Sequence, residues 1–268
     1  MSQDRTVELM AVAEQLAREA GDLVREATSG AVAVAATKSS GVDLVTEVDQ
    51  AAEALIRRRL AELRPDDGIL GEEDGQSTGT SGLTWVVDPI DGTTNFVYGL
   101  PYHSVSIAVA RHDGQDPYAW PVLAAAVHAP AQQRTWTAAL GEGAFADGRR
   151  LENVPATSLG TSLVGTGFAY TAERRSGQAQ VLTAVLPRVR DIRRLGSAAV
   201  DLCLVAEGQL DLFYEQYLNP WDMAAGALVV REAGGVVRRL GEGEAGFTVA
   251  GPAQLVEELT TVLDGVRG

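Results

Sequence analysis

Two carboxylates stand three positions apart at the end of an apolar run, in the stretch Thr84–Phe96 (TWVVDPIDGTTNF). A carboxylate at the end of a buried strand is partly desolvated, and two of them in one turn repel each other. Either one of Asp88 and Asp91 is protonated or a cation lies between them. Because no lysine or arginine occurs between Arg64 and Arg111, the alternative is a hard divalent metal, which prefers oxygen ligands.

More acids of the same kind occur elsewhere. Glu72 and Glu73 follow a short apolar run, and Asp222 opens an expected helix directly after Trp221. The three histidines show no ligand spacing and Cys203 is isolated, so the pattern favours magnesium over zinc. Each acid also has a plainer interpretation, since Asp222 could cap its helix and the two glutamates could form a solvated turn.

The residues that follow the acid pair are suited to an anion. Gly92 permits a tight turn, and Thr93, Thr94 and Asn95 are good helix-start residues. Free N–H groups at a helix start bind phosphate, and the helix dipole favours the negative charge. A metal–carboxylate cluster beside such a site is the arrangement that phosphate-ester hydrolysis needs.

A second class of phosphatase also has acids after an apolar strand. The haloacid-dehalogenase-like enzymes use Asp-x-Asp-Gly-Thr, in which the first Asp is a nucleophile and the second a general acid. Here the spacing is Asp88-Pro-Ile-Asp91-Gly-Thr, one residue longer. That extra residue breaks the alignment, so the spacing argues against the phosphoenzyme mechanism.

Composition limits the partners. The 268 residues are 46% hydrophobic and 22% charged, a globular balance, and the formal net charge is −14. This charge argues against nucleic acid or an anionic membrane as a partner. The arginine clusters at 57–59 and 188–194 are interpreted as solvated faces or salt bridges. Because no apolar segment suits a signal peptide or membrane span, we expect a cytoplasmic protein.

Periodicity predicts helices and strands in a mixed order. The predicted helices cover residues 5–27, 46–63, 172–187, 197–207, 221–233 and 252–264. The predicted strands cover residues 84–87, 104–110, 119–128, 134–140, 162–166, 190–194, 210–214 and 235–239. Residues 74–82 contain no apolar side chain and are expected to form a mobile loop. The first half is expected to be antiparallel, and the second half to add βα units on another sheet.

With these residues assembled, the sequence resembles the inositol monophosphatase family over almost its whole length, and looks most like the bacterial inositol-1-monophosphatases. Four segments carry the resemblance: Lys38–Asp49, Gly71–Glu73, Trp85–Phe96 and Trp221–Gly226. The resemblance implies one layered α/β domain of αβαβα type, shared with the fructose-bisphosphatases. Its N-terminal α+β half would span about 1–158 and its C-terminal α/β half about 159–268.

The resemblance also implies Mg²⁺-dependent hydrolysis without a phosphoenzyme, with two or three ions per site. The implied metal ligands are Glu72, Asp88, the Ile90 carbonyl, Asp91 and Asp222. The implied catalytic residues are Asp49, Glu72 and Thr93. The implied substrate-binding residues are Asp91, Gly92, Thr93, Ser197, Ala198, Glu215 and Asp222. Thr46-x-x-Asp49 also matches a capping box, so Asp49 could cap a helix, orient the attacking water, or do both.

The implied substrate is myo-inositol 1-phosphate or a related small phosphorylated polyol, with Glu215 binding ring hydroxyls. Glu215 could otherwise be a surface acid at a strand end. Alternatives with the same chemistry are fructose 1,6-bisphosphate, histidinol phosphate and 3′-phosphoadenosine 5′-phosphate. A different alternative is a regulatory scaffold that assists transcription complexes. Lithium sensitivity and a homodimer are further expectations that the resemblance brings.

Overall fold

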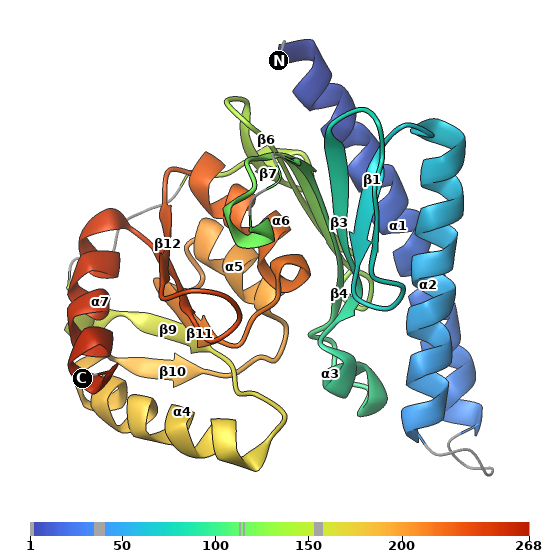
Figure 1. The fold of residues 1–268 in the computed structure, drawn as a ribbon. Helices are drawn as coiled ribbons and strands as arrows, with labels where there is room; N and C mark the ends of the chain where they lie inside the picture. Colours follow the sequence, from blue (N-terminus) through green and yellow to red (C-terminus); the bar gives the residue numbers. More distant parts are fainter. Residues whose placement is uncertain (1–2, 35–40, 113, 115, 153–157, 268) are drawn as a thin grey trace.

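The computed structural model describes residues 3–34, 41–112, 114, 116–152 and 158–267 (Figure 1). Two long helices, α1 (Gln3–Val34) and α2 (Gly41–Leu63), open the chain. Both are longer than their periodicity predicts. Because α2 begins at Gly41, Thr46 lies inside the helix and cannot be its N-cap. The interpretation of Asp49 as a capping-box residue at Thr46 is therefore wrong.

The first sheet has eight strands and carries the acid pair. In spatial order they are β2 (Gln76–Ser77), β1 (Gly68–Gly71), β3 (Leu83–Asp91), β4 (Ser104–Arg111), β5 (Val122–Ala129), β6 (Arg134–Ala139), β7 (Gly143–Ala146) and β8 (Arg149–Arg150). The pairing is antiparallel from β3 to β8, as the sequence predicts, while β1 runs parallel to β3. The short helix α3 (Thr93–Val97) follows β3 directly.

The second sheet has five strands. Their spatial order is β10 (Asp191–Arg193), β9 (Leu163–Thr166), β11 (Leu212–Gln216), β13 (Phe247–Gly251) and β12 (Val236–Leu240). The helices of this half are α4 (Ala172–Val185), α5 (Ala198–Ala206), α6 (Pro220–Glu232) and α7 (Ala253–Arg267). Strands β10, β9 and β11 are parallel, which fits the βα units predicted here.

The elements stack in five layers, and the predicted αβαβα architecture is confirmed (Figure 1). Helices α1 and α2 cover one face of the first sheet, α5 and α6 lie between the sheets, and α4 and α7 cover the outer face of the second sheet. Every residue of α5 is buried, as expected for a helix that is apolar at every position except Asp201. The end of β3 meets the start of α5, where Asp91 accepts hydrogen bonds from Ser197 and the Ala199 N–H.

Some strands were missed by the sequence analysis. Strand β2 lies within the expected loop at 74–82, where polar residues pair with β1 as a short hairpin arm. Strands β7, β8 and β13 are also absent from the prediction. Strand β7 is short and begins with a glycine, β8 consists of two arginines, and the apolar run of β13 is not predicted as a strand. In the described residues no helix is long and apolar enough to cross a membrane.

Candidate active site

A β-bulge explains how the acid pair comes to face one cavity. In a regular strand, residues three apart point to opposite faces of the sheet. Asp88 pairs with Ser106 and Asp91 with Ser104, so two residues of β3 stand opposite one of β4. The extra residue, in the Pro89-Ile90 dipeptide, restores both carboxylates to the same face. Proline is tolerated in a sheet at such an irregularity.

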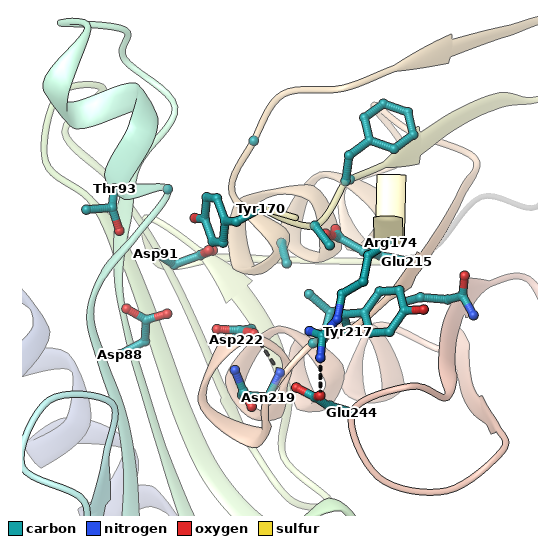
Figure 2. Close-up of a pocket in the computed structure, with 18 of the residues that line it drawn as sticks. Asp88, Asp91, Thr93, Tyr170, Arg174, Glu215, Tyr217, Asn219, Asp222 and Glu244 are labelled. Atoms are coloured by element: carbon teal, nitrogen blue, oxygen red, sulfur yellow. Dashed lines mark hydrogen bonds and ion pairs between the residues drawn. The ribbon is translucent and has the colours of Figure 1, made fainter. Parts of the chain in front are cut away.

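The two acids line a cavity of about 330 Å³ between the sheets (Figure 2). The β3 end, the start of α3, the segment before α4, the start of α5 and the β11–α6 connection form its walls. Its lining includes the predicted residues Glu72, Asp88, Ile90, Asp91, Gly92, Thr93, Ala198, Glu215 and Asp222. Elements from both halves of the chain therefore bring these side chains together.

Asp91 is held by the start of α5. Its Oδ2 accepts hydrogen bonds from Ser197 Oγ at 2.6 Å and from the Ala199 N–H at 2.7 Å. Ser197 is buried, and its hydroxyl also accepts from the Val200 N–H as the helix N-cap. Ser197 thus lies behind the cavity wall and orients Asp91, while its neighbour Ala198 lines the cavity itself.

The Asp222 side chain belongs both to the start of α6 and to the cavity lining. Its Oδ2 accepts from the Asn219 N–H at 2.7 Å at the start of α6, so the helix-capping interpretation of this residue holds. The same side chain lines the cavity beside Asp88 and Asp91 (Figure 2). Capping with one oxygen fixes the carboxylate and leaves the other oxygen for a ligand.

The carboxylates raise one another's pKa values. Burial and the neighbouring Glu72, Asp91 and Asp222 raise the pKa of Asp88. Burial raises the pKa of Asp91 to about 6, against the lowering effect of its Ser197 and Ala199 hydrogen bonds. Burial and the charge of Asp91 raise the pKa of Asp222. The repulsion between neighbouring carboxylates that the sequence predicts is therefore present in the folded chain.

Asp49 lies on α2, outside the cavity lining but close enough to feel its charges. It is 5% exposed, and burial, followed by the charges of Glu72 and Glu73, raises its pKa to about 8. Burial also raises the pKa of Glu72 to about 7, although that side chain is open to the cavity.

The donor set fits a hard divalent cation. It consists of carboxylates and one backbone carbonyl, the oxygen ligands that Mg²⁺ prefers. Asp49 Oδ1 and Asp88 Oδ1 are buried with no hydrogen-bond partner among the described residues. Within those residues no three His, Cys, Asp or Glu side chains form a ready-made metal cage. The acids surround the cavity from separate walls, and a cation would relieve their unpaired charge.

The turn after Asp91 is the tight turn and helix start that the sequence predicts. Gly92 has φ 95°, and a Cβ there would lie 2.8 Å from the Tyr102 carbonyl oxygen, so only glycine fits. Helix α3 begins at Thr93, whose hydroxyl donates to the Ile90 carbonyl at 3.1 Å. The first N–H groups of a helix have no partner within it. Gly92 and Thr93 both line the cavity.

The far wall of the cavity holds Glu215 and an ion pair (Figure 2). Glu215 packs so closely on Gly167 that a Cβ at Gly167 would lie 2.1 Å from the carboxylate. Burial and the charge of Asp201 raise the pKa of Glu215. Arg174 pairs with Glu244 at 2.5 Å, and its guanidinium stacks 4.4 Å from the centre of the Tyr217 ring.

Several lining residues were missed by the sequence analysis, namely Gly167, Tyr170, Arg174, Arg194, Tyr217 and Glu244. Arg194 belongs to the cluster at 188–194 that the sequence leads us to interpret as solvated or salt-bridged, and the structure places it at the cavity. Arg174 lies in the first turn of α4, and the others come from loops that the fold alone brings to the cavity. Lys38, the first residue of the family-like segment Lys38–Asp49, lies outside the described residues.

Comparisons with known proteins place the chain in one family. The model of the "Inositol monophosphatase family" matches residues 6–263. The chain is 44% identical to the inositol-1-monophosphatase of Mycobacterium leprae, over 97% of this chain and 95% of the relative. It is 38% identical to the Nus factor SuhB of Escherichia coli K12, over 94% of each. The solved structure of Mycobacterium tuberculosis SuhB superposes with a TM-score of 0.83 at 41% identity, covering 98% of both chains.

Proposed function

This chain belongs to the inositol monophosphatase family, and on that premise we propose that it hydrolyses myo-inositol 1-phosphate and related inositol monophosphates in a Mg²⁺-dependent reaction. The observation that carries the proposal is the bulge in β3, which turns Asp88 and Asp91 to the same cavity as Glu72 and Asp222. The names of the similar mycobacterial proteins support inositol 1-phosphate as the substrate.

In the proposed site the metal is held by oxygen atoms alone. Its ligands are Glu72, Asp88, the Ile90 carbonyl, Asp91 and Asp222. When bound, Mg²⁺ would supply Lewis-acid polarisation of the phosphate and a lowered pKa for the attacking water. A cation in this position would also return the raised pKa values of these acids toward their ordinary range.

The chain's own residues divide the remaining tasks. The N–H groups of Gly92 and Thr93 donate to the phosphate oxygens and fix their orientation. Asp49 and the Thr93 hydroxyl orient the attacking water, and Asp49 accepts its proton. Ser197 keeps Asp91 in place from behind. Glu215 and the backbone at Ala198 contact the hydroxyl groups of the departing polyol.

A substrate panel tests the proposal. The purified chain is assayed for phosphate release from myo-inositol 1-phosphate, fructose 1,6-bisphosphate, histidinol phosphate and 3′-phosphoadenosine 5′-phosphate, with Mg²⁺ and with a chelator. We expect inositol 1-phosphate to have the highest kcat/KM, and all turnover to require Mg²⁺. A higher kcat/KM for another phosphomonoester would contradict the substrate assignment while leaving the chemistry intact.

A regulatory role is a second candidate, because the similar Escherichia coli protein is named a Nus factor. Such a role would use the surface of the fold and would not need the carboxylates. Asp91→Asn separates the two, since it removes a proposed metal ligand but retains an acceptor for Ser197 and Ala199. If the chain acts in transcription complexes, this variant retains that activity and loses phosphate release.

A further inference from the structure

Glu53 is a fully buried acid that has no place in the reaction described above. It lies on α2, one turn after Asp49, and its exposed fraction is 0%. A buried carboxylate is costly unless it is paired and hydrogen-bonded. Glu53 is both, since Arg57 donates to its Oε1 at 2.8 Å and two backbone N–H groups donate to its oxygens.

Those two N–H groups belong to the turn that carries Glu72. The Glu73 N–H donates to Glu53 Oε2 at 2.9 Å, and the Asp74 N–H donates to Oε1 at 3.0 Å. The ends of the turn are joined by a hydrogen bond from the Gly71 N–H to the Gly75 carbonyl at 3.0 Å. The carboxylate therefore fills the inside of the turn and takes up its free donors.

Two neighbouring residues, Gly71 and Arg57, allow and support the contact between the Glu53 carboxylate and the turn. A Cβ at Gly71 would lie 2.3 Å from Glu53 Oε1, so glycine lets the carboxylate approach the backbone. Arg57 also donates to the Gly75 carbonyl at 2.7 Å, so the same guanidinium holds both the acid and the end of the turn. The Glu53 carboxylate, the Arg57 guanidinium and the backbone of the turn are hydrogen-bonded to one another, so the carboxylate is buried with its hydrogen-bond partners in place.

One face of α2 thus connects two parts of the proposed active site. Asp49, Glu53 and Arg57 are spaced four residues apart, so they lie along one side of the helix. Asp49 is the proposed proton acceptor, and Glu53 fixes the turn from which Glu72 reaches the cavity. The helix therefore sets the position of Glu72 relative to Asp49.

We propose that Glu53, held by Arg57, is a positioning residue that fixes the Glu72 turn in the geometry needed for metal binding. The part of this inference that concerns metal binding rests on the proposed function. The part that concerns the position of the turn does not. Outer residues that orient metal ligands typically change metal affinity 10- to 100-fold when they are altered.

The test compares Glu53→Gln with the wild-type chain in two measurements. Amide exchange of Glu73 and Asp74 is measured without metal, and Mg²⁺ affinity is measured by calorimetry with the metal alone. Because hydrogen bonds to a charged group are lost, we expect exchange to accelerate about 10- to 100-fold. We expect the Mg²⁺ dissociation constant to rise about 10-fold or more.

Glu19→Gln is the matched control. It removes a salt bridge to Arg59 that links the same two helices at 2.9 Å but does not reach the turn. We expect it to lower the Tm without altering either measurement. If Glu53→Gln fails to fold, Arg57→Met gives the test, since it leaves Glu53 in place and removes its cation; the same changes are expected at smaller size.

Three results would overturn the inference or its premise. Unchanged exchange in Glu53→Gln would show that the carboxylate does not hold the turn. Faster exchange with unchanged Mg²⁺ affinity would show that the turn does not position the ligand. Failure of the wild-type chain to bind Mg²⁺ would contradict the proposed function, and the metal-free exchange data would still decide whether Glu53 holds the turn.

Discussion

The unusual residues of this protein are its unpaired buried acids. Asp88 is 1% exposed and Asp49 is 5% exposed, and each has an oxygen with no hydrogen-bond partner among the described residues. Buried polar atoms of native proteins nearly always have partners, so such groups point to function. At this scale stability and activity are opposed, because the charges that attract a metal repel one another without it.

Asp88→Asn tests that opposition directly. Removing one charge from the cluster should raise the unfolding free energy of the metal-free protein at pH 8 by about 1–3 kcal/mol, as measured by urea denaturation with a chelator present. The same change should abolish Mg²⁺-dependent phosphate release. Asp22→Asn, at an exposed acid paired with Arg25, should alter neither quantity appreciably. A destabilised metal-free Asp88→Asn protein would contradict this account.

Glu215→Gln addresses the substrate end of the cavity. If the carboxyl group binds ring hydroxyls, kcat/KM for inositol 1-phosphate should fall about 10-fold or more. Turnover of p-nitrophenyl phosphate, which lacks those hydroxyls, should be nearly unchanged because the metal end is intact. Equal losses for both substrates would show that Glu215 acts on the site as a whole.

At the scale of elements, strong periodicity determined what could be predicted. The helices of the second half and the strands β4, β5 and β6 follow clear apolar patterns and were predicted within a few residues. The strand-to-turn motif around Asp88 and Asp91 was recognisable because its glycine and proline have fixed conformational uses. The two-residue strands β2 and β8 owe their form to pairing with neighbours, which local sequence does not reveal, whereas β13 (FTVAG) has a local strand pattern that the prediction lacks.

The same distinction applies to the candidate site. Glu72, Asp88, Asp91, Asp222 and Glu215 could be named because each is an acid beside an apolar run or in a family-like segment. Arg174, Tyr217 and Glu244 could not, since the start of α4 and two separate loops bring them to the cavity wall and no spacing relates them. The role of Ser197 behind Asp91 likewise depends on how the start of α5 meets the end of β3.

Gly167→Ala tests the packing of two neighbouring elements. The new methyl group would overlap the Glu215 carboxylate, so that side chain must move. We expect the loss of inositol-phosphate selectivity seen with Glu215→Gln, although the carboxylate is still present. Gly177→Ala in α4 is the control, because nothing lies within 4 Å of its added Cβ. It should preserve activity and stabilise the helix by up to about 1 kcal/mol.

At the scale of the molecule, an acidic chain forms the proposed site for an anionic substrate. The net charge is −14, and the cavity adds buried acids from both halves of the fold. Cations lining the far wall are limited in the described structure to Arg174 and Arg194, and Arg174 is engaged by Glu244. A bound metal is therefore the main means by which this site could attract a phosphate.

Stability should depend on pH in a characteristic direction. The pKa values of Asp49 (about 8), Glu72 (about 7) and Asp91 (about 6) lie above the values near 4 of an unfolded chain. Between pH 4 and 8 the metal-free native state binds protons that the unfolded state has released. The unfolding free energy should therefore fall as pH rises through this window. Thermal melts in chelator should show a falling Tm.

Adding Mg²⁺ should reverse that trend, because a ligand that binds only the native state stabilises it. The gain in Tm should be greatest near pH 8, where the carboxylates are least protonated and bind the metal best. A metal-free Tm that rises between pH 6 and pH 8 would contradict the assignment of raised pKa values. A gain independent of pH would contradict metal binding by these acids.

The most direct test of the central claim is phosphate release from myo-inositol 1-phosphate, titrated with Mg²⁺, by the wild-type chain and by Asp91→Asn. We predict saturable Mg²⁺-dependent turnover by the wild-type chain and none above background for the variant, with both proteins folded by circular dichroism. Turnover that persists in chelator, or that survives in Asp91→Asn, would contradict the claim that the acids of β3 form the metal-dependent catalytic centre.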